Sequence, residues 1–388
     1  MKPETSILHP SSSLKDPYGA TSTPIYQTAT FAQPHADQSG EYDYSRSGNP
    51  TRDELQIQLA SLDNAKHAFT FTTGMAAISA ICRILEPGDE IIANLDVYGG
   101  THRYFTQVLA KQNIKTHFVN TKNPEKIISY INKNTKLLWI ETPSNPFQHI
   151  TDIKEIASLK DQLGLQLCID NSMMSSWAQK PLSLGADVVI QSATKYLSGH
   201  SDLSAGVVTT NSPYFANHLT FIQNAEGTAL APFDSWLLIR GLQTIALRFE
   251  RQQENAAKLT NYLVNNSLVK RVYYARLVGH EGYQTHRNQA TGSGGVLSFE
   301  TESKAFSKAI VEATKLFSIS VSFGSLKSTI SLPCYMSHAS ISDDDQTIPN
   351  NLIRISVGIE NIDDLIADLR QGFHAAKNTL RIAKSSEV

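Results

Sequence analysis

The sequence contains few cysteines and no long apolar run. Its three cysteines lie far apart, and Cys82 and Cys168 stand inside apolar segments, where a thiol acts as a small hydrophobic group. This spacing makes neither a disulfide framework nor a metal cluster. No apolar run approaches the roughly 20 residues that cross a bilayer, and residues 1–13 lack the apolar core of a signal peptide. We therefore expect a cytoplasmic protein that neither enters a membrane nor holds a metal.

An excess of charge of either sign is also missing. The chain has 34 basic and 36 acidic residues mixed along its length, for a formal net charge of -2. This balance offers no basic surface to nucleic acid or to an acidic membrane. Small neutral or zwitterionic substrates stay open. With 41% hydrophobic residues among 388, the chain can bury one large core or two smaller ones.

The pattern along the chain divides it into an arm and two domains. Residues 1–45 hold turn formers and scattered apolar side chains without a helical period, so we expect an extended arm that lies on the domain body or on a second subunit. Over residues 46–235, apolar strands alternate with amphipathic helices, which predicts a doubly wound, mainly parallel α/β sheet covered on both faces. Residues 236–388 begin in a long helical stretch and predict a smaller C-terminal α/β domain.

Polar residues at the ends of predicted strands mark the expected ligand edge of the sheet. Gly74 follows a strand and starts a helix, so the N–H groups of Gly74 and Met75 can face an anion, although a tight turn also explains the glycine. Asp170 closes an apolar strand, where a buried carboxylate needs a cationic or protonated partner unless it caps a helix. Asn145 stands between two prolines after another strand, and its amide can donate to an oxygen or complete a turn.

Lys195 ends the segment "DVVIQSATK", with Ser192 and Thr194 three and one positions before it. A buried lysine with a neutral amine can form a Schiff base with an aldehyde, and nearby hydroxyls can bind a phosphate on the same cofactor. A surface lysine in a serine-rich loop would explain these residues taken singly. Together with Gly74, Asp170 and the flat ring of Tyr98, they form the set that pyridoxal phosphate (PLP) requires.

Long motifs in a fixed order carry a resemblance to a known family. From "YDYSRSGNPTR" through "YGGTHRYF", "ETPSNP" and "SATKYLSGHSD" to "LIRISVGIE", the chain resembles the Cys/Met-metabolism family of PLP-dependent trans-sulfuration enzymes, and most of all its cystathionine β-lyases. The resemblance implies the fold type I of PLP-dependent transferases and a homotetramer built from active dimers. It also implies a carbon–sulfur lyase that converts cystathionine, a small amino-acid substrate, to homocysteine, pyruvate and ammonia.

The resemblance also assigns roles to residues. Lys195 resembles the Schiff-base lysine that also moves the Cα proton, Tyr98 the stacked catalytic aromatic, and Asp170 the partner of the pyridine nitrogen. Arg354 resembles the arginine that binds the substrate carboxylate, although a charge on an edge strand would also explain it. The remaining implied ligands are Gly74, Met75, Ser192 and Thr194 for the phosphate, Tyr44 and Arg46 for the phosphate of the neighbouring subunit, and Asn145 and Ser328 for the substrate.

Three positions depart from the family pattern or bear on specificity. Lys327 replaces a glutamate that many γ-acting members carry, which argues against γ-elimination, whereas Asp43 is acidic as in γ-type members. Gln191 replaces the usual histidine, with no consequence that the sequence alone defines. A cystathionine γ-lyase, a γ-synthase or an O-acylhomoserine enzyme therefore stays as the alternative. A PLP-binding protein without turnover and an aminotransferase are the remaining alternatives.

Overall fold

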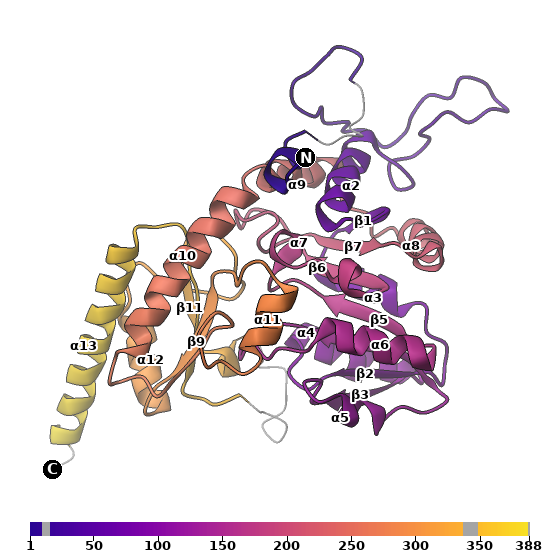
Figure 1. Cartoon of the computed structure of the whole chain (residues 1–388). Coiled ribbons are helices and arrows are strands. Elements are labelled where there is room, and N and C mark those ends of the chain that lie inside the picture. The colour runs from indigo at the N-terminus through magenta and orange to yellow at the C-terminus, as the bar shows by residue number, and fades with distance from the viewer. Residues whose placement is uncertain (10–15, 337–347, 387–388) are drawn as a thin grey trace. The chain divides into compact units, whose positions relative to one another are not determined.

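The computed structural model describes residues 1–9, 16–336 and 348–386 of the chain (Figure 1). The α-helices are α1 (Pro3–Ser6), α2 (Pro50–Asp63), α3 (Gly74–Cys82), α4 (Gly99–Arg103), α5 (Pro124–Ile128), α6 (Ile153–Leu163), α7 (Ser175–Ala178), α8 (Pro213–Glu226), α9 (Pro232–Leu242), α10 (Ile245–Val264), α11 (Tyr283–Gln289), α12 (Lys304–Ala313) and α13 (Ile362–Ser386). The other helical segments are the π-helix η1 (Tyr104–Val108) and the 3₁₀ segments η2 (Leu109–Gln112), η3 (Pro181–Leu184) and η4 (Pro333–Tyr335).

Twelve strands in the described chain form two sheets. The strands are β1 (His67–Phe71), β2 (Glu90–Asn94), β3 (Lys115–Val119), β4 (Thr135–Glu141), β5 (Gln166–Asp170), β6 (Val188–Ser192), β7 (Gly206–Thr210), β8 (Arg271–Tyr273), β9 (Val296–Glu300), β10 (Ser318–Ile319), β11 (Thr329–Ser331) and β12 (Leu352–Ser356). The larger sheet has the order β1-β7-β6-β5-β4-β2-β3, and the smaller one has the order β10-β11-β12-β9-β8. The predicted α/β class is confirmed.

One strand of the larger sheet is antiparallel to its neighbours, which the prediction of a mainly parallel sheet allows. β5 and β6 are parallel, whereas β7 is antiparallel to both β1 and β6, with Val188 opposite Thr210. A parallel return needs a crossover connection, usually a helix, and residues 193–205 between β6 and β7 form turns instead. The sheet is therefore mixed around β7, and the turns after β6 hold Lys195.

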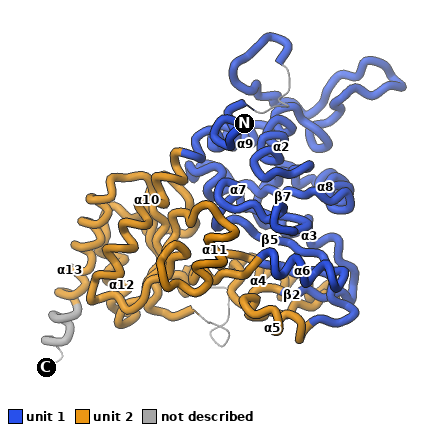
Figure 2. Tube along the Cα trace, in the orientation of Figure 1, with its two compact units in different colours: residues 1–92, 131–140, 153–246 blue, residues 93–130, 141–152, 247–388 orange. Residues whose placement is uncertain are grey.

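By its contacts, the chain divides into two compact units (Figure 2). Unit 1 comprises Met1–Ile92, Ile131–Ile140 and Ile153–Ala246, and unit 2 comprises Ala93–Tyr130, Glu141–Asp152 and Leu247–Val388. The core of unit 1 contains Leu55 and Leu59 of α2, Val207 of β7 and Leu238 of α9, all almost completely buried. Burying such side chains contributes about 1.5–3 kcal/mol each, which holds α2 and α9 against the strands. The domain boundaries at residues 45 and 235 stay a prediction beside this division.

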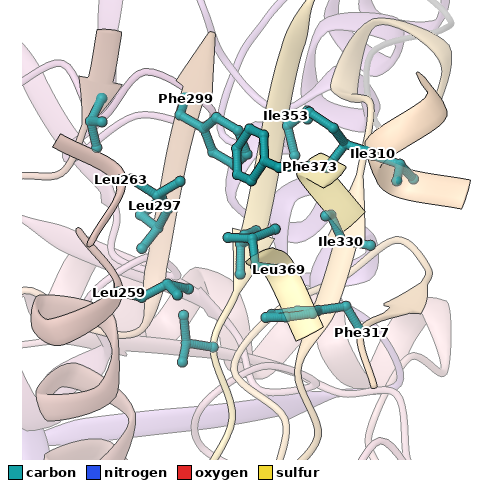
Figure 3. Packing of buried hydrophobic residues seen from close by; sticks show 14 of the residues in the cluster. Leu259, Leu263, Leu297, Phe299, Ile310, Phe317, Ile330, Ile353, Leu369 and Phe373 are labelled. Atoms are coloured by element: carbon teal, nitrogen blue, oxygen red, sulfur yellow. The ribbon is translucent and has the colours of Figure 1, made fainter. Parts of the chain in front are cut away.

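In unit 2, the five-stranded sheet packs against helices α10, α12 and α13 (Figure 3). Leu263 of α10, Phe299 of β9 and Phe373 of α13 belong to one buried cluster, and the rings of Phe299 and Phe373 lie 6.1 Å apart between centroids. β10 is parallel to β11, and the other neighbouring pairs are antiparallel. The apolar segments "RVYYA", "GGVLSFE" and "LIRISVGIE" of the sequence predict β8, β9 and β12. The sequence predicts neither β10 nor β11, because segments of two and three residues are too short to show an alternating pattern.

Two predicted helices are interrupted. The sequence of residues 234–259 predicts one long helix, but the structure ends α9 at Leu242 and starts α10 at Ile245. Near this break, Gly241 lets the backbone of α9 pack closely against Ser198, because a Cβ atom on Gly241 would lie 2.5 Å from the carbonyl oxygen of Ser198. The sequence of residues 101–112 also predicts a single helix, but the structure changes there from α4 to the π-helix η1 and the 3₁₀ segment η2. Among the described residues, no helix is both long enough and apolar enough to span a membrane.

Candidate active site

In unit 1, Lys195 lies in the turns directly after β6 and is partly buried. Its backbone N–H donates to the carbonyl oxygen of Ser192 at 3.1 Å, and its own carbonyl accepts from Gly199 N at 2.8 Å. Ala193 and Tyr196, which flank Thr194 and Lys195 in the sequence, are buried apolar residues that anchor this turn in the core. The lysine is therefore held on a rigid backbone rather than on a solvated loop, as the Schiff-base prediction requires.

Asp170 ends β5 and is 6% exposed. The backbone N–H of Ser172 donates to Asp170 Oδ1 at 2.9 Å. Burial raises the pKa of Asp170, whereas the bonds from Ser172 and the charge of Lys195 oppose that rise. A carboxylate in this state has a strong preference for a nearby cation, and a protonated pyridine nitrogen would supply one. The helix-cap alternative for Asp170 is not needed, because its side chain bonds the turn before α7 instead.

Ser172 connects the end of β5 to the end of β6. Its hydroxyl oxygen accepts from the backbone N–H of Ser192 at 2.7 Å, while its own N–H and side chain bond Asp170. The hydrogen bonds from Asp170 through Ser172 to Ser192 thereby fix the spacing between the predicted pyridine partner and the segment that bears Lys195. Sequence reasoning did not identify Ser172, although its place two residues after Asp170 was a usable signal.

Gly74 and Ser192, both predicted phosphate ligands, lie side by side. A Cβ atom on Gly74 would come within 3.2 Å of the Ser192 Cβ atom and 3.3 Å of its Oγ atom. Gly74 begins α3, a helix of nine residues, whose first N–H groups lack intrahelical partners. The missing side chain thus keeps a space beside these donors and the Ser192 hydroxyl, which makes no hydrogen bond within the described chain. These groups fit a phosphate.

Met75 and Thr194 complete the predicted phosphate set with different geometry. Met75 follows Gly74 in the first turn of α3 and is half-buried. The Thr194 hydroxyl donates to the carbonyl oxygen of Ala205 at 3.3 Å and accepts from Ala205 N at 3.0 Å. Thr194 therefore also fastens the turns after β6 to the start of β7, and only its remaining lone pair is left for hydrogen bonding.

Gln191 has a definite structural partner in α7. The Ser176 N–H donates to Gln191 Oε1 at 2.9 Å, and Gln191 Nε2 donates to the Ser176 hydroxyl. Both side chains are buried, as is Asp63 at the end of α2, which accepts from Thr209 and from Ser176. Burial raises the pKa of Asp63 to about 6. This buried network connects β6 to α7 and α2 through Gln191, the residue before Ser192.

Tyr44 near the end of the arm and Arg46 directly after the arm are exposed and lie together. The Arg46 guanidinium carbon is 5.4 Å from the centroid of the Tyr44 ring. Arg46 Nη1 also donates to the carbonyl oxygen and to Oδ1 of Asn224 in α8, at 2.7 and 2.9 Å. Asp43, the neighbouring acid, bonds the N–H of Tyr44 at 2.6 Å. Within unit 1, this pair is thus positioned against α8.

In unit 2, Arg354 and Asn145 form one buried cluster. Arg354 lies in β12, is 2% exposed and donates from Nη1 to Asn145 Oδ1 at 3.2 Å and from Nη2 to the carbonyl oxygen of Ser322 at 3.0 Å. Asn145 follows β4 in a turn with cis peptide bonds before Pro143 and Pro146. The guanidinium is thereby held in a fixed plane, the arrangement that recognises a carboxylate with two hydrogen bonds.

Tyr98 and Ser328 also belong to unit 2. Tyr98 precedes α4, and its N–H donates to Glu141 Oε2 at 2.9 Å while its ring is 43% exposed. Ser328 is fully buried, and its hydroxyl donates to Glu360 at 2.9 Å and accepts from Gly358 N at 2.9 Å. The hydroxyl of Ser328 is therefore engaged within the chain, which gives it a structural role that the sequence did not predict.

Comparison with known proteins identifies the family of the chain. The model of the family "Cys/Met metabolism PLP-dependent enzyme" matches residues 4–374. The chain is 51% identical over 361 residues to a cystathionine β-lyase of Arabidopsis thaliana described as chloroplastic, covering 92% of this chain and 78% of that protein. It is 41% identical over 374 residues to a cystathionine γ-lyase of Bacillus subtilis, covering 96% and 99%.

Solved structures give the same result for the fold. A cystathionine γ-lyase from Lactobacillus plantarum, complexed with L-serine, superposes with a TM-score of 0.95 at 39% identity, covering 97% of this chain and 100% of that one. A cystathionine γ-synthase from Xanthomonas oryzae pv. oryzae, complexed with cystathionine, gives a TM-score of 0.95 at 34% identity, covering 98% and 99%. The predicted PLP-dependent fold is confirmed.

Proposed function

Because the chain belongs to the Cys/Met-metabolism family of PLP-dependent enzymes, we propose that it cleaves L-cystathionine by β-elimination to homocysteine, pyruvate and ammonia. The similarity to cystathionine β-lyases of Arabidopsis thaliana, at 51% identity, and of Neurospora crassa, at 45%, supports this substrate. The observation that carries the chemistry is the buried Asp170, tied through Ser172 to the segment of Ser192 and Lys195.

Residues of unit 1 would hold the cofactor. When bound, PLP supplies an aldehyde carbon for covalent attachment to an amine and a ring that accepts the electron pair released at Cα. The Nζ atom of Lys195 would carry that attachment and then take the Cα proton of the substrate. Asp170 would keep the pyridine nitrogen protonated. The phosphate would be held by Gly74, Met75, Ser192 and Thr194.

Residues of unit 2 would hold the substrate. Arg354 would grip both oxygens of the α-carboxylate, with Asn145 fixing the plane of its guanidinium, and Ser328 would support the segment from Lys327 to Thr329. Tyr98 would stack on the ring and serve as a proton donor for the leaving thiolate. The bond from Cβ to sulfur breaks with its electron pair on sulfur, and the protonated thiol leaves as homocysteine.

The assembly and location of the enzyme belong to the same proposal. The exposed pair Tyr44 and Arg46 would serve the phosphate of a neighbouring subunit within an active dimer, and two dimers would form a homotetramer in the cytoplasm. The exposure of both side chains, at the end of the arm and directly after it, supports this arrangement. Sedimentation of the purified enzyme should give the mass of four chains, and a monomer would contradict the assembly.

Cleavage at Cγ is the second candidate. The 41% identity to the γ-lyase of Bacillus subtilis supports it. The exposed Lys327, at the position where many γ-acting members have glutamate, supports β-cleavage instead. The two reactions differ in their keto acid, because β-elimination releases pyruvate and γ-elimination releases 2-oxobutyrate with free cysteine.

One assay tests both statements. The holoenzyme is incubated with L-cystathionine, and the keto acid is identified by its mass. Pyruvate with homocysteine is expected, and 2-oxobutyrate with cysteine would assign the other bond. Lys195→Ala should lower the rate by about 10³-fold or more, since the residue that carries the proton is lost. Full activity of Lys195→Ala would refute the proposed mechanism, and Lys180→Ala is the matched control.

A further inference from the structure

Unit 2 contains a cavity of about 340 Å³ that none of the proposed catalytic roles uses. Its volume lies in the range of small-molecule binding sites in proteins. The side chains that matter for its chemistry are Asp96, Lys122, Phe147, His149, Arg271 and Glu281. They combine cations, carboxylates and aromatic rings, so the cavity differs from a purely apolar packing defect.

His149 presents one ring nitrogen to this cavity with the other already occupied. His149 Nδ1 lies 2.8 Å from Asp96 Oδ2, and the side chains of His149 and Asp96 are 33% and 10% exposed. The Ser144 hydroxyl donates to the same Asp96 oxygen, and the Phe147 ring stacks on the imidazole at 5.3 Å. Within the described chain, Nε2 of His149 makes no hydrogen bond. The histidine is thus held rigidly with Nε2 available to a ligand.

This arrangement is not that of a hydrolase triad or a metal site. The Ser144 hydroxyl donates to Asp96 rather than to the imidazole, so the histidine cannot take its proton. In the described parts of the chain, no group of three or more His, Cys, Asp or Glu residues has a geometry that could hold a metal ion. The remaining function of such a cluster is recognition of a small organic molecule.

The charges around the cavity are unequally paired. Lys122 forms an ion pair with Glu281 at 2.8 Å, and Asp96 is satisfied by His149 and Ser144. The Arg271 guanidinium lies 4.7 Å from the centroid of the Tyr273 ring, and within the described chain it forms no ion pair with a carboxylate. Arg271 and His149 line this cavity together.

We propose that this cavity binds a small carboxylate-bearing metabolite, whose carboxylate contacts Arg271 and His149 Nε2 and whose carbon skeleton lies against Phe147 and Tyr273. A guanidinium recognises a carboxylate with two hydrogen bonds, and the fixed imidazole adds a third donor in its protonated form. None of these four side chains has a proposed role in holding PLP or cystathionine.

The test uses the holoenzyme and probes without an amine, succinate and benzoate, which cannot attach to PLP. Binding is followed by saturation-transfer NMR and the dissociation constants by titration. Arg271→Met and His149→Phe should each weaken binding about tenfold or more, because each removes a charge-assisted hydrogen bond. Arg354→Ala should leave the binding of these probes unchanged within twofold. Lys308→Met, on the exposed face of α12, controls for the loss of one positive charge.

Two results would overturn the proposal. One is probe binding that Arg354→Ala abolishes and Arg271→Met leaves intact, because the carboxylate would then occupy the proposed substrate position. The other is a wild-type enzyme that binds neither succinate nor benzoate, or that binds inorganic phosphate alone. Arg271 is exposed, so Arg271→Met keeps the fold and the test stands even where His149→Phe disturbs the Asp96 contact.

Discussion

The end of β6 in unit 1 and the start of β11 in unit 2 each present a serine that the sequence predicts to bind a ligand. The Ser192 hydroxyl stays out of the hydrogen bonds of the described chain and lies beside the gap that Gly74 leaves, whereas its backbone N–H is held by Ser172. The Ser328 hydroxyl instead donates to Glu360 and accepts from Gly358 N. The same residue type would therefore serve a ligand in one region and holds a loop in the other, and only its hydrogen-bond partners distinguish the two roles.

The two regions also differ in how their residues come together. Asp170, Ser172, Ser192 and Lys195 lie within 26 positions and meet at neighbouring parallel strands. Arg354 and Asn145 are separated by 209 positions and meet only because β12 and the turn after β4 lie in one unit. Residues that lie close together in the sequence can be recognised as a motif, whereas two residues far apart in the sequence cannot. Substitutions in the two regions should consequently fail in different ways.

The largest effect is expected at Arg354. Arg354→Ala should raise KM strongly and lower kcat/KM by about 2–5 kcal/mol in transition-state binding, since a buried carboxylate of the substrate loses its partner. Arg354→Lys keeps the charge but not the paired donors, so its KM and kcat/KM should lie between those of the wild type and those of Arg354→Ala. Steady-state kinetics with cystathionine measures this. An unchanged KM in both variants would assign Arg354 to the structure of β12 alone.

A buried acid in the β6 region gives the next effect. Burial raises the pKa of Asp63 from 3.8 to about 6, so its contribution to stability is present below pH 3.8 and lost as pH rises through 6. Asp63→Asn removes this loss and should stabilise the apoprotein at pH 8 by as much as about 3 kcal/mol. Urea unfolding at pH 8 and at pH 3.5 measures the difference, which should vanish at the lower pH. A variant less stable than the wild type at pH 8 would show that the charge is compensated.

The serine pair tests the opening comparison directly. Ser192→Ala should weaken cofactor binding about tenfold, through one lost charge-assisted hydrogen bond, and change the unfolding free energy of the apoprotein by under about 0.5 kcal/mol. Ser328→Ala should do the reverse, with a loss of about 1–3 kcal/mol in stability, because Glu360 and Gly358 N lose a buried partner. Cofactor titration and urea unfolding of both variants check this. Equal profiles for the two serines would refute the distinction.

These contrasts explain what sequence could predict. The α/β class followed from apolar strands alternating with amphipathic helices, and the fold type followed from the ordered motifs, because both signals are local and repeated. The reversal of β7, the strands β10 and β11 and the break between α9 and α10 depend on packing between distant segments, such as Gly241 against Ser198. The partners of Ser328 lie 30 and 32 positions away, so no local pattern contains them.

The smallest effect is expected at Gln191, where the usual family residue is histidine. Gln191 both accepts from and donates to Ser176. A neutral imidazole also has one donor and one acceptor nitrogen, but the two ring nitrogens point in different directions, so they cannot both reach the N and Oγ atoms of one residue. Gln191→His should therefore cost about 1 kcal/mol at pH 8, and more at pH 5.5, where a buried imidazole must stay neutral against its tendency to protonate. A double-mutant cycle with Ser176→Ala separates this coupling from general loss of packing, since the penalty should shrink once Ser176 is gone. A penalty that persists in full would show that packing within β6, and not the contact with Ser176, disfavours histidine at this position. In that case, Ser172 alone would link β6 to its neighbours in the comparison of the two regions.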